Sequence, residues 1–344
     1  IIIAPKVVAV AANGIDLDNP ANLLGEADVW NMGTGDIAIG SSSSDGLTVI
    51  LEKKNDGAVT IHNYDNEEHK KTQLIVASQI EANGDASFIN DNGDLITARA
   101  ATVETANNGT LANEFGVKTT KKVFMQATNG EIYNMMDISS IIAPAPRMMR
   151  AMALGSLGSD LTENTIDMVS TTGIHNLGNV TSTVGHVYMT ATDGSSIINE
   201  KAVTAAQDVK MAAGGEIINK GDVTSGTNML MQAGTNIVNE GSLTSSAVGD
   251  NDGKAIELTA ETGSITNAGS TITAADGDIR LSAKGTDAAK AVINNGSAIN
   301  AATGSVTLEA TGDIVNTGGV TSGLMAGLTS TSGSITNTGN GIFY

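Results

Sequence analysis

The sequence predicts an all-β protein that coils into a parallel β-helix, a β-solenoid with three short strands in each coil of about 20 residues. Three recurring segments in the second half of the 344 residues predict this fold: an Ile-x-Asn segment, a Val-Thr-Ser segment and a longer strand of strictly alternating apolar residues. Gly, Asn and Asp separate the segments. The period of two therefore belongs to strands joined by turns, not to helices.

The Ile-x-Asn segment supplies one asparagine per repeat. Because an amide within an apolar row needs hydrogen-bond partners, we expect these side chains to point inward. There they would bond to one another from coil to coil, as stacked amides do in cross-β assemblies. The alternative is a plain preference of asparagine for turns. The predicted ladder consists of Asn176, Asn199, Asn219, Asn239, Asn267, Asn294, Asn316 and Asn337.

The long alternating strand supplies the predicted core and an outward row. Successive strand side chains face opposite sides, so Met229, Met231 and Ala233 point inward, and the same positions are apolar in the other repeats. The residues between them form the outward row Phe124, Tyr188, Lys210, Leu230, Glu257, Arg280 and Thr307. Phe124, Tyr188 and Leu230 mark a candidate lateral contact. Glu257 and Arg280 are expected to pair on adjacent coils.

The pattern divides the chain into irregular N-terminal coils (1–140), an insertion (141–172) and regular repeats (173–344). The insertion holds two of the four Pro and two of the four Arg, and Arg147, Met148, Met149 and Arg150 form a candidate protruding loop that binds a partner. The alternative is an excursion that lies back over the solenoid. Candidate earlier rungs of the asparagine row are Asn31, Asn63, Asn90 and Asn134.

Composition narrows the class of partner. The formal net charge of −19 makes nucleic acid and anionic membrane surfaces poor partners. No apolar run reaches the length of a membrane span, so we predict no membrane insertion. The chain has no Cys and therefore no disulfide scaffold. The charged segment Asn66–Lys71 is predicted to be a solvated turn. Because the chain starts without Met and stops within a repeat, we expect a processed chain or a fragment.

The sequence predicts no enzyme, no cofactor and no metal site. The four histidines, His62, His69, His175 and His186, lack metal-ligand spacing. Asp91–Asp94 and Asp250–Gly253 resemble calcium loops but lack the EF-hand length and its final Glu. Two alternatives stay open on this fold: a polysaccharide lyase or hydrolase with converging charges along one groove, and a carbohydrate-binding module on the face with Phe124, Tyr188 and Leu230.

The repeats resemble those of the filamentous haemagglutinin family, for example over Gly304–Val320, where Val306, Leu308 and Ala310 alternate and Ile314-Val315-Asn316 follows. The likeness is strong for residues 173–341 and looser before them. The family's secretion-domain signatures, Asn-Pro-Asn-Gly and Asn-Pro-Asn-Leu, are only partly echoed by Ala12–Ile15 and Asn19–Leu23.

The resemblance implies a secreted bacterial exoprotein with a right-handed parallel β-helix, which passes through an outer-membrane secretion pore and stands at the cell surface or in the extracellular space. Its expected role is the structural shaft of an adhesin or of a self-assembling extracellular fibre in adhesion, aggregation or biofilm. The expected partners are a glycan or protein on a host or neighbouring cell, and further copies of the chain that join head-to-tail or laterally.

Overall fold

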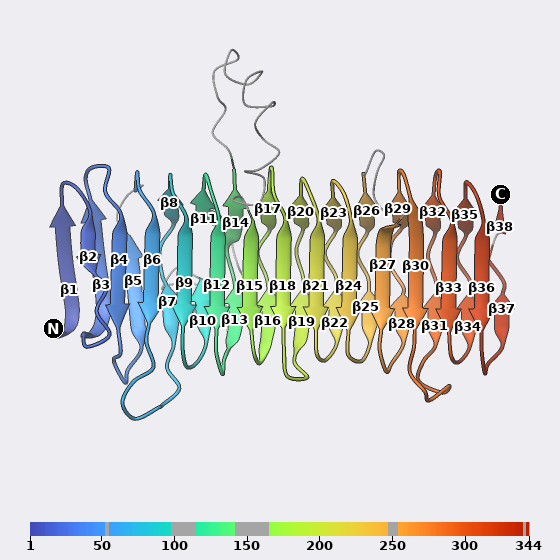
Figure 1. Ribbon diagram of the computed structural model, residues 1–344, viewed down its shortest axis with the longest axis horizontal. Coiled ribbons are helices and arrows are strands. Elements are labelled where there is room, and N and C mark those ends of the chain that lie inside the picture. The colour runs from blue at the N-terminus through green and yellow to red at the C-terminus, as the bar shows by residue number, and fades with distance from the viewer. Residues whose placement is uncertain (52–54, 98–114, 142–164, 247–253, 340–341, 344) are drawn as a thin grey trace, which may run out of the picture. The chain divides into compact units, whose positions relative to one another are not determined.

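The computed structural model describes residues 1–344 except 52–54, 98–114, 142–164, 247–253, 340–341 and 344. Every regular element among the described residues is a β-strand, and the chain forms two compact units, Ile1–His186 (the first unit) and Val187–Tyr344 (the second unit). The strands pair in parallel and follow one another in coil order (Figure 1). The predicted right-handed parallel β-helix is therefore confirmed.

The second unit repeats three strands in constant order, and each kind of strand builds its own parallel sheet. The ladder sheet contains β19 (Ser196–Asn199), β22 (Ile217–Asn219), β25 (Ile237–Asn239), β28 (Ile265–Asn267), β31 (Ile293–Asn295), β34 (Ile314–Asn316) and β37 (Ile335–Asn337). The long-strand sheet contains β18 (Val187–Ala191), β21 (Val209–Ala213), β24 (Met229–Ala233), β27 (Lys254–Ala260), β30 (Asp278–Ala283), β33 (Val306–Ala310) and β36 (Ala326–Ser330). The third sheet contains β20 (Val203–Ala205), β23 (Val223–Ser225), β26 (Leu243–Ser245), β29 (Ile272–Ala274), β32 (Ile299–Ala301), β35 (Val320–Ser322) and β38 (Ile342–Phe343).

The first unit has the same three kinds of sheet, but its opening coils are simpler. Its ladder sheet contains β1 (Ile3–Ala11), β3 (Leu23–Asn31), β5 (Leu47–Leu51), β7 (Leu74–Val76), β10 (Leu95–Thr97), β13 (Glu131–Asn134) and β16 (Gly173–Asn176). Its long-strand sheet contains β2 (Ile15–Leu17), β4 (Ile37–Ser41), β6 (Val59–Asn63), β9 (Ala86–Asn90), β12 (Val123–Ala127) and β15 (Ile166–Ser170). Its third sheet contains β8 (Ile80–Ala82), β11 (Phe115–Thr119), β14 (Asp137–Ser140) and β17 (Val180–Ser182). From β1 to β7 the described strands alternate between two sheets, so the three-strand coil begins with β8.

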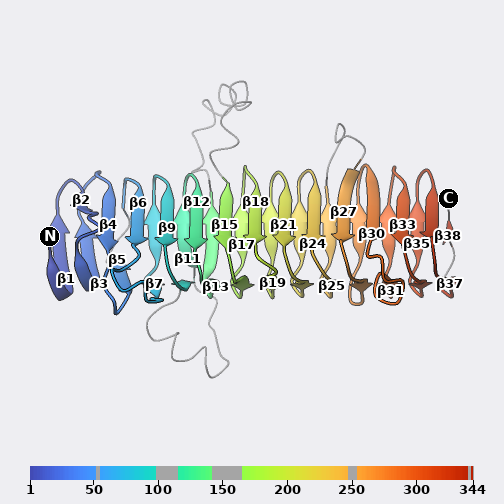
Figure 2. The same ribbon diagram turned by 60° about the horizontal axis from the view of Figure 1, so that its bottom comes forward.

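The core of each unit consists of side chains stacked in register. In the second unit Met189 lies opposite Met211, and Met211 lies opposite Met231 on the following coil. All three are fully buried, as the alternation predicts. Complete burial of such a side chain stabilises the fold by about 1.5–3 kcal/mol. The turned view shows the same coil order in both units (Figure 2).

Aspartates at the turns bind the backbone of the next coil. A carboxylate oxygen of Asp222 accepts a hydrogen bond from the backbone N–H of Ser242 at 3.0 Å, and Asp278 accepts one from Ser305 at 2.7 Å. These carboxylates therefore have a local structural role, because each satisfies a turn N–H that strand pairing leaves free.

One sequence expectation needs correction, and another concerns residues that the structure does not describe. Strand β15 falls inside the range predicted to be an insertion, yet Ile166 and Met168 are fully buried in the long-strand sheet. The alternation of Ile166, Met168 and Ser170 was the signal for this strand. Arg147, Met148, Met149 and Arg150 lie outside the described residues. Among the described residues no helix has the length and apolar character needed to cross a bilayer.

Candidate functional site

The most regular feature of the second unit is a column of asparagine side chains. Each side-chain amide nitrogen donates to the side-chain oxygen of the asparagine one coil further on. The donor–acceptor distances are 2.7 Å for Asn199–Asn219, 2.8 Å for Asn219–Asn239, 2.9 Å for Asn239–Asn267, 2.7 Å for Asn267–Asn295, 2.6 Å for Asn295–Asn316 and 2.7 Å for Asn316–Asn337. In the first unit Asn134 donates to Asn176 at 2.7 Å.

The side-chain nitrogen also donates to a backbone carbonyl two residues further on in Asn199, Asn219, Asn239, Asn295 and Asn316. Asn219 donates to the backbone carbonyl of Gly221 at 2.8 Å, and Asn239 donates to that of Gly241 at 2.8 Å. Both side chains are fully buried. Each amide therefore joins adjacent coils and also closes the turn that leaves its own strand, so its buried polar atoms are satisfied as a buried amide requires.

The structure places seven of the eight predicted ladder residues in these columns, and Asn294 is the exception. Strand β31 pairs Ile293 with Ile265 and Asn295 with Asn267, so Asn295 points inward and Asn294 is exposed. The sequence offers two adjacent asparagines after two adjacent β-branched residues, which makes two registers look alike. A shift of one residue turns every side chain to the other face of the strand, and only the buried pairing with Ile265 selects the observed register.

The earlier candidate rungs do not form one row. Asn31 and Asn134 lie in the ladder sheet, where Asn31 donates to Asn55 at 2.7 Å. Asn63 and Asn90 lie at the ends of β6 and β9 in the long-strand sheet, where Asn63 donates to Asn90 at 2.9 Å. A strand sequence that ends in asparagine therefore does not by itself identify the sheet to which it belongs.

The candidate lateral contact is interrupted. In the second unit Tyr188 lies opposite Lys210, and Lys210 lies opposite Leu230, so a lysine separates the two apolar residues. In the first unit Phe124 lies between Ser87 and Asp167, with the amino group of Lys122 5.4 Å from its ring centre. The structure does not bring the three predicted residues together.

The expected ion pair between Glu257 and Arg280 is not formed, because each residue pairs with a different partner. The two residues are neighbours on adjacent coils, as predicted. However, Arg280 binds Glu309 at 2.6 Å, and Glu257 binds Lys254 at 3.5 Å. The guanidinium reaches the following coil instead of the preceding one.

Three of the histidines, His62, His69 and His175, each pair with one carboxylate. His62 binds Asp91 at 2.9 Å, and His175 binds Glu131 at 3.3 Å while its ring stacks on Tyr133. A hydrogen bond to Glu131, followed by burial, raises the pKa of Tyr133 to about 12. No three His, Asp or Glu side chains in the described ranges come together as a metal-binding group.

A groove opens in the first unit. It has a volume of about 1230 Å³ and is formed where the starts of β1 and β3 meet three turns. The groove is lined by Ile1, Ile3, Ala4, Pro5, Pro20, Ala21, Leu23, Gly25, Ser42–Asp45 and Asp65–His69. One wall is apolar, and the rim carries hydroxyl and carboxylate groups. Its residues come from four separate stretches of the sequence.

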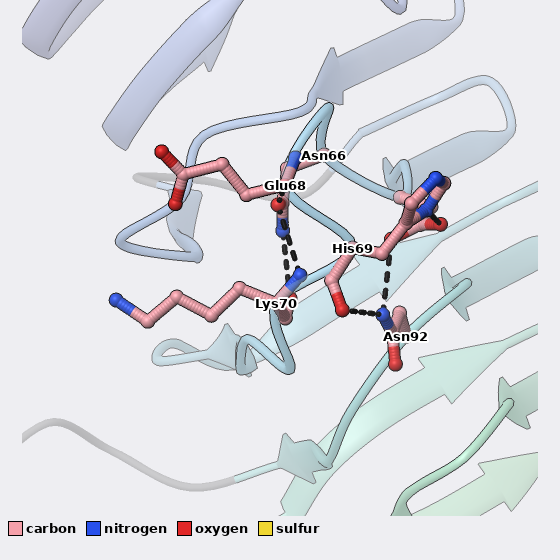
Figure 3. Close-up of polar contacts among 6 residues, drawn as sticks. Asn66, Glu68, His69, Lys70 and Asn92 are labelled. Carbon is pink, nitrogen blue, oxygen red and sulfur yellow. Dashed lines mark hydrogen bonds and ion pairs between the residues drawn. The ribbon is translucent and has the colours of Figure 1, made fainter.

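Buried amides hold the rim loop of the groove in one conformation. The side-chain oxygen of Asn66 accepts the backbone N–H groups of Glu68 and Lys70, both at 3.1 Å, and its nitrogen donates to the carbonyl of Lys70 at 2.7 Å (Figure 3). Asn92 donates to the carbonyl of His69 at 2.9 Å and to Asp65 at 3.0 Å. Asn66 and Asn92 are both buried.

The carboxylates on the rim of the groove give it negative charge. The His69 ring, 2.5 Å from Asp65, and the amide of Asn92 lower the pKa of the Asp65 carboxyl below its ordinary value. Glu67 and Glu68 are exposed at the tip of the loop. The sequence prediction of a solvated charged turn missed this site. The signal was the pair of asparagines, Asn66 and Asn92, whose side chains replace strand pairing across the loop.

Comparison with protein-family models, curated proteins and solved structures finds no match for this chain. The resemblance to filamentous haemagglutinin repeats stays an expectation drawn from the repeat pattern.

Proposed function

We propose that this chain is a structural shaft of a secreted bacterial surface adhesin or of a self-assembling extracellular fibre. The observation that carries the proposal is the uninterrupted amide ladder from Asn199 to Asn337 in the second unit. A side chain that recurs in every coil and bonds only within the protein serves the stacking of coils, not the recognition of a ligand.

The hydrogen bonds of the ladder run from one coil to the next, which supports a mechanical role. Strand hydrogen bonds and amide hydrogen bonds in a solenoid both run from one coil to the next. A force that separates coils is therefore shared by three sheets and the ladder. The Asn-x-Gly turns add close packing, since a Cβ at Gly241 would lie 2.0 Å from the carbonyl oxygen of Gly221.

The proposed setting follows from the resemblance of the repeats. The chain would be exported through an outer-membrane pore and would stand at the cell surface or in the extracellular space. There it would meet a glycan or protein of a host or neighbouring cell, and it would assemble head-to-tail or laterally with further copies. The formal net charge of −19 favours solubility in such a setting.

Single-molecule force spectroscopy tests the mechanical part. The second unit, pulled between its first and last coils, is expected to unfold at high force in steps of about one coil. Asn219→Ala is expected to lower that force, whereas Asn294→Ala, which changes an exposed asparagine, leaves it unchanged. Extension at low force without steps would overturn the proposal.

Location is tested separately on the cells that make the protein. Protease added to intact cells is expected to remove the chain, and immunogold labelling is expected to place it on the surface or on extracellular fibres. Full protection from protease in intact cells, together with cleavage after lysis, would contradict a surface role.

A further inference from the structure

The groove of the first unit combines exposed apolar surface with negative charge. Ile3 and Leu23 line its apolar wall and are 74% and 40% exposed. Large apolar side chains that remain in contact with water beside a cavity are typical of a surface that another molecule covers. The groove, at about 1230 Å³, is larger than the usual site of one small ligand and suits several side chains of a peptide.

Most of the charged side chains around the groove are acidic, which favours a cationic occupant. Its rim carries Asp45, Asp65, Glu67 and Glu68, and no Lys or Arg is among the groove residues. The nearest lysines in the sequence are Lys6, which follows Pro5 and pairs with Glu26 and Asp28, and Lys70, which follows the rim loop. His69 is already bound to Asp65. The complementary partner therefore has basic groups on either side of apolar ones.

The chain itself contains one segment with this pattern. Arg147 and Arg150 flank Met148 and Met149, and Pro146 precedes them. Two of the four arginines of the chain lie here. Unbranched methionine side chains adapt to irregular apolar walls, while the guanidinium groups can form bidentate bonds with carboxylates.

We propose that the groove of one copy binds the Arg147–Arg150 segment of a second copy. The proposal rests on the self-assembly part of the proposed function and supplies its contact. The rim carboxylates would bind the two guanidinium groups, and Ile3 and Leu23 would contact the methionines.

Chain geometry favours a second copy over the same copy. Strand β13 lies four strand spacings from β3, or about 19 Å along the first unit. The six residues from Ile141 to Arg147 reach about 20 Å when fully extended. Moreover, Ile141 follows β14 in the third sheet, whereas the rim loop joins β6 of the long-strand sheet to β7 of the ladder sheet. Contact of this segment with Leu23 in the same copy would therefore require a nearly fully extended chain that also passes around the coil.

A labelled peptide of residues 143–154 provides the direct test. Fluorescence anisotropy with the full chain is expected to show saturable binding that weakens as salt screens the charges. Glu67→Lys with Glu68→Lys is expected to weaken binding at least about tenfold, a change of about 1.4 kcal/mol. The matched control, Glu240→Lys, reverses an exposed acid of the second unit and is expected to leave binding unchanged. Circular dichroism checks that each variant folds.

Analytical ultracentrifugation of the full chain separates the outcomes. Glu67→Lys/Glu68→Lys and Arg147→Glu/Arg150→Glu are each expected to reduce self-association, and mixing the two variants is expected to restore it. Peptide binding equal in wild type and the groove variant would overturn the proposal, as would a wild-type monomer at every concentration. If wild type assembles and both variants assemble equally well, the groove contact is wrong while assembly through another surface stands.

Discussion

Asn267 donates a hydrogen bond of 2.7 Å to Asn295 on the next coil, whereas Asn294, adjacent to Asn295 in sequence, faces outward. Asn295 in turn donates to Asn316 at 2.6 Å and to the carbonyl of Ser297 at 2.8 Å. Of these two chemically identical neighbours, Asn295 therefore carries three hydrogen bonds, two of them buried, and Asn294 is exposed. This contrast offers an internal control for the contribution of the ladder.

Replacing Asn295 by Ala is expected to lower the free energy of unfolding by about 2–4 kcal/mol, because Asn267 and Asn316 would keep buried polar atoms without partners. Asn294→Ala is expected to change it by less than about 0.5 kcal/mol. Urea denaturation followed by circular dichroism measures both. Equal losses for the two variants would contradict the assigned register.

The Asn-x-Gly turn requires glycine because the turns of adjacent coils come very close. A Cβ at Gly241 would lie 2.0 Å from the carbonyl oxygen of Gly221, so Gly241→Ala is expected to destabilise the fold by about 1–3 kcal/mol through forced backbone shifts. Gly327, in β36, has no atom within 4 Å of the equivalent position. There Ala is expected to be neutral or stabilising by up to about 1 kcal/mol, and thermal melts compare the two.

Two of the four tyrosines are expected to ionise at a higher pH than an ordinary tyrosine. Burial, followed by a hydrogen bond to Asp18, raises the pKa of Tyr64 to about 12. The hydrogen bond to Glu131 and burial raise the pKa of Tyr133 to the same value. A raised pKa adds stability below the ordinary value of 10.0 that is lost as the pH rises through the folded value.

Absorbance titration of the phenolates measures this shift. The native chain is expected to show two tyrosines that ionise near pH 12, and Tyr64→Phe and Tyr133→Phe should each remove one of them. In urea all four should ionise near 10. Native titration of all four near 10 would rule out both contacts.

Acid should weaken the last turns of the second unit. The backbone N–H of Ser334, at 2.7 Å, and then its hydroxyl lower the pKa of Asp313 below its ordinary value of 3.8. The resulting stability is present above pH 3.8 and disappears as the pH falls through the folded value. Carboxyl NMR titration is expected to find Asp313 below 3.8 in the native chain and at its ordinary value in urea. A native value at or above 3.8 would exclude the contact.

The Arg280–Glu309 ion pair is expected to contribute little to the free energy of unfolding. Both side chains are more than a third exposed, so a double-mutant cycle with Arg280→Gln and Glu309→Gln is expected to give a coupling energy of about 0–1 kcal/mol. The corresponding cycle for Arg280 and Glu257 should give none, since Glu257 binds Lys254. A larger coupling to Glu257 than to Glu309 would show that the pairing differs in solution.

The regular repeats made much of the fold predictable. Where Ile, Val or Leu alternates with polar residues between Gly-rich turns, as from Val187 to Ser245, the local pattern alone predicts strands, their inward faces and the position of each ladder asparagine. The pattern was insufficient at Val292–Asn295, where two registers fit equally well. It was also insufficient at Asn63 and Asn90, where an Ile-x-Asn or Phe-x-Asn sequence ends a strand of the long-strand sheet instead of the ladder sheet.

The groove could not be predicted from any single stretch of the sequence. Its wall comes from Ile3 and Leu23 and its rim from Asp45 and Asp65–His69, which only the coiling of the chain brings together. The sequence by itself determined the coil, its period and its inward side chains, because these depend on alternation within a few residues. The tertiary structure decided which asparagine enters the ladder and where a cavity opens, because both depend on the coil that packs alongside, far away in the sequence.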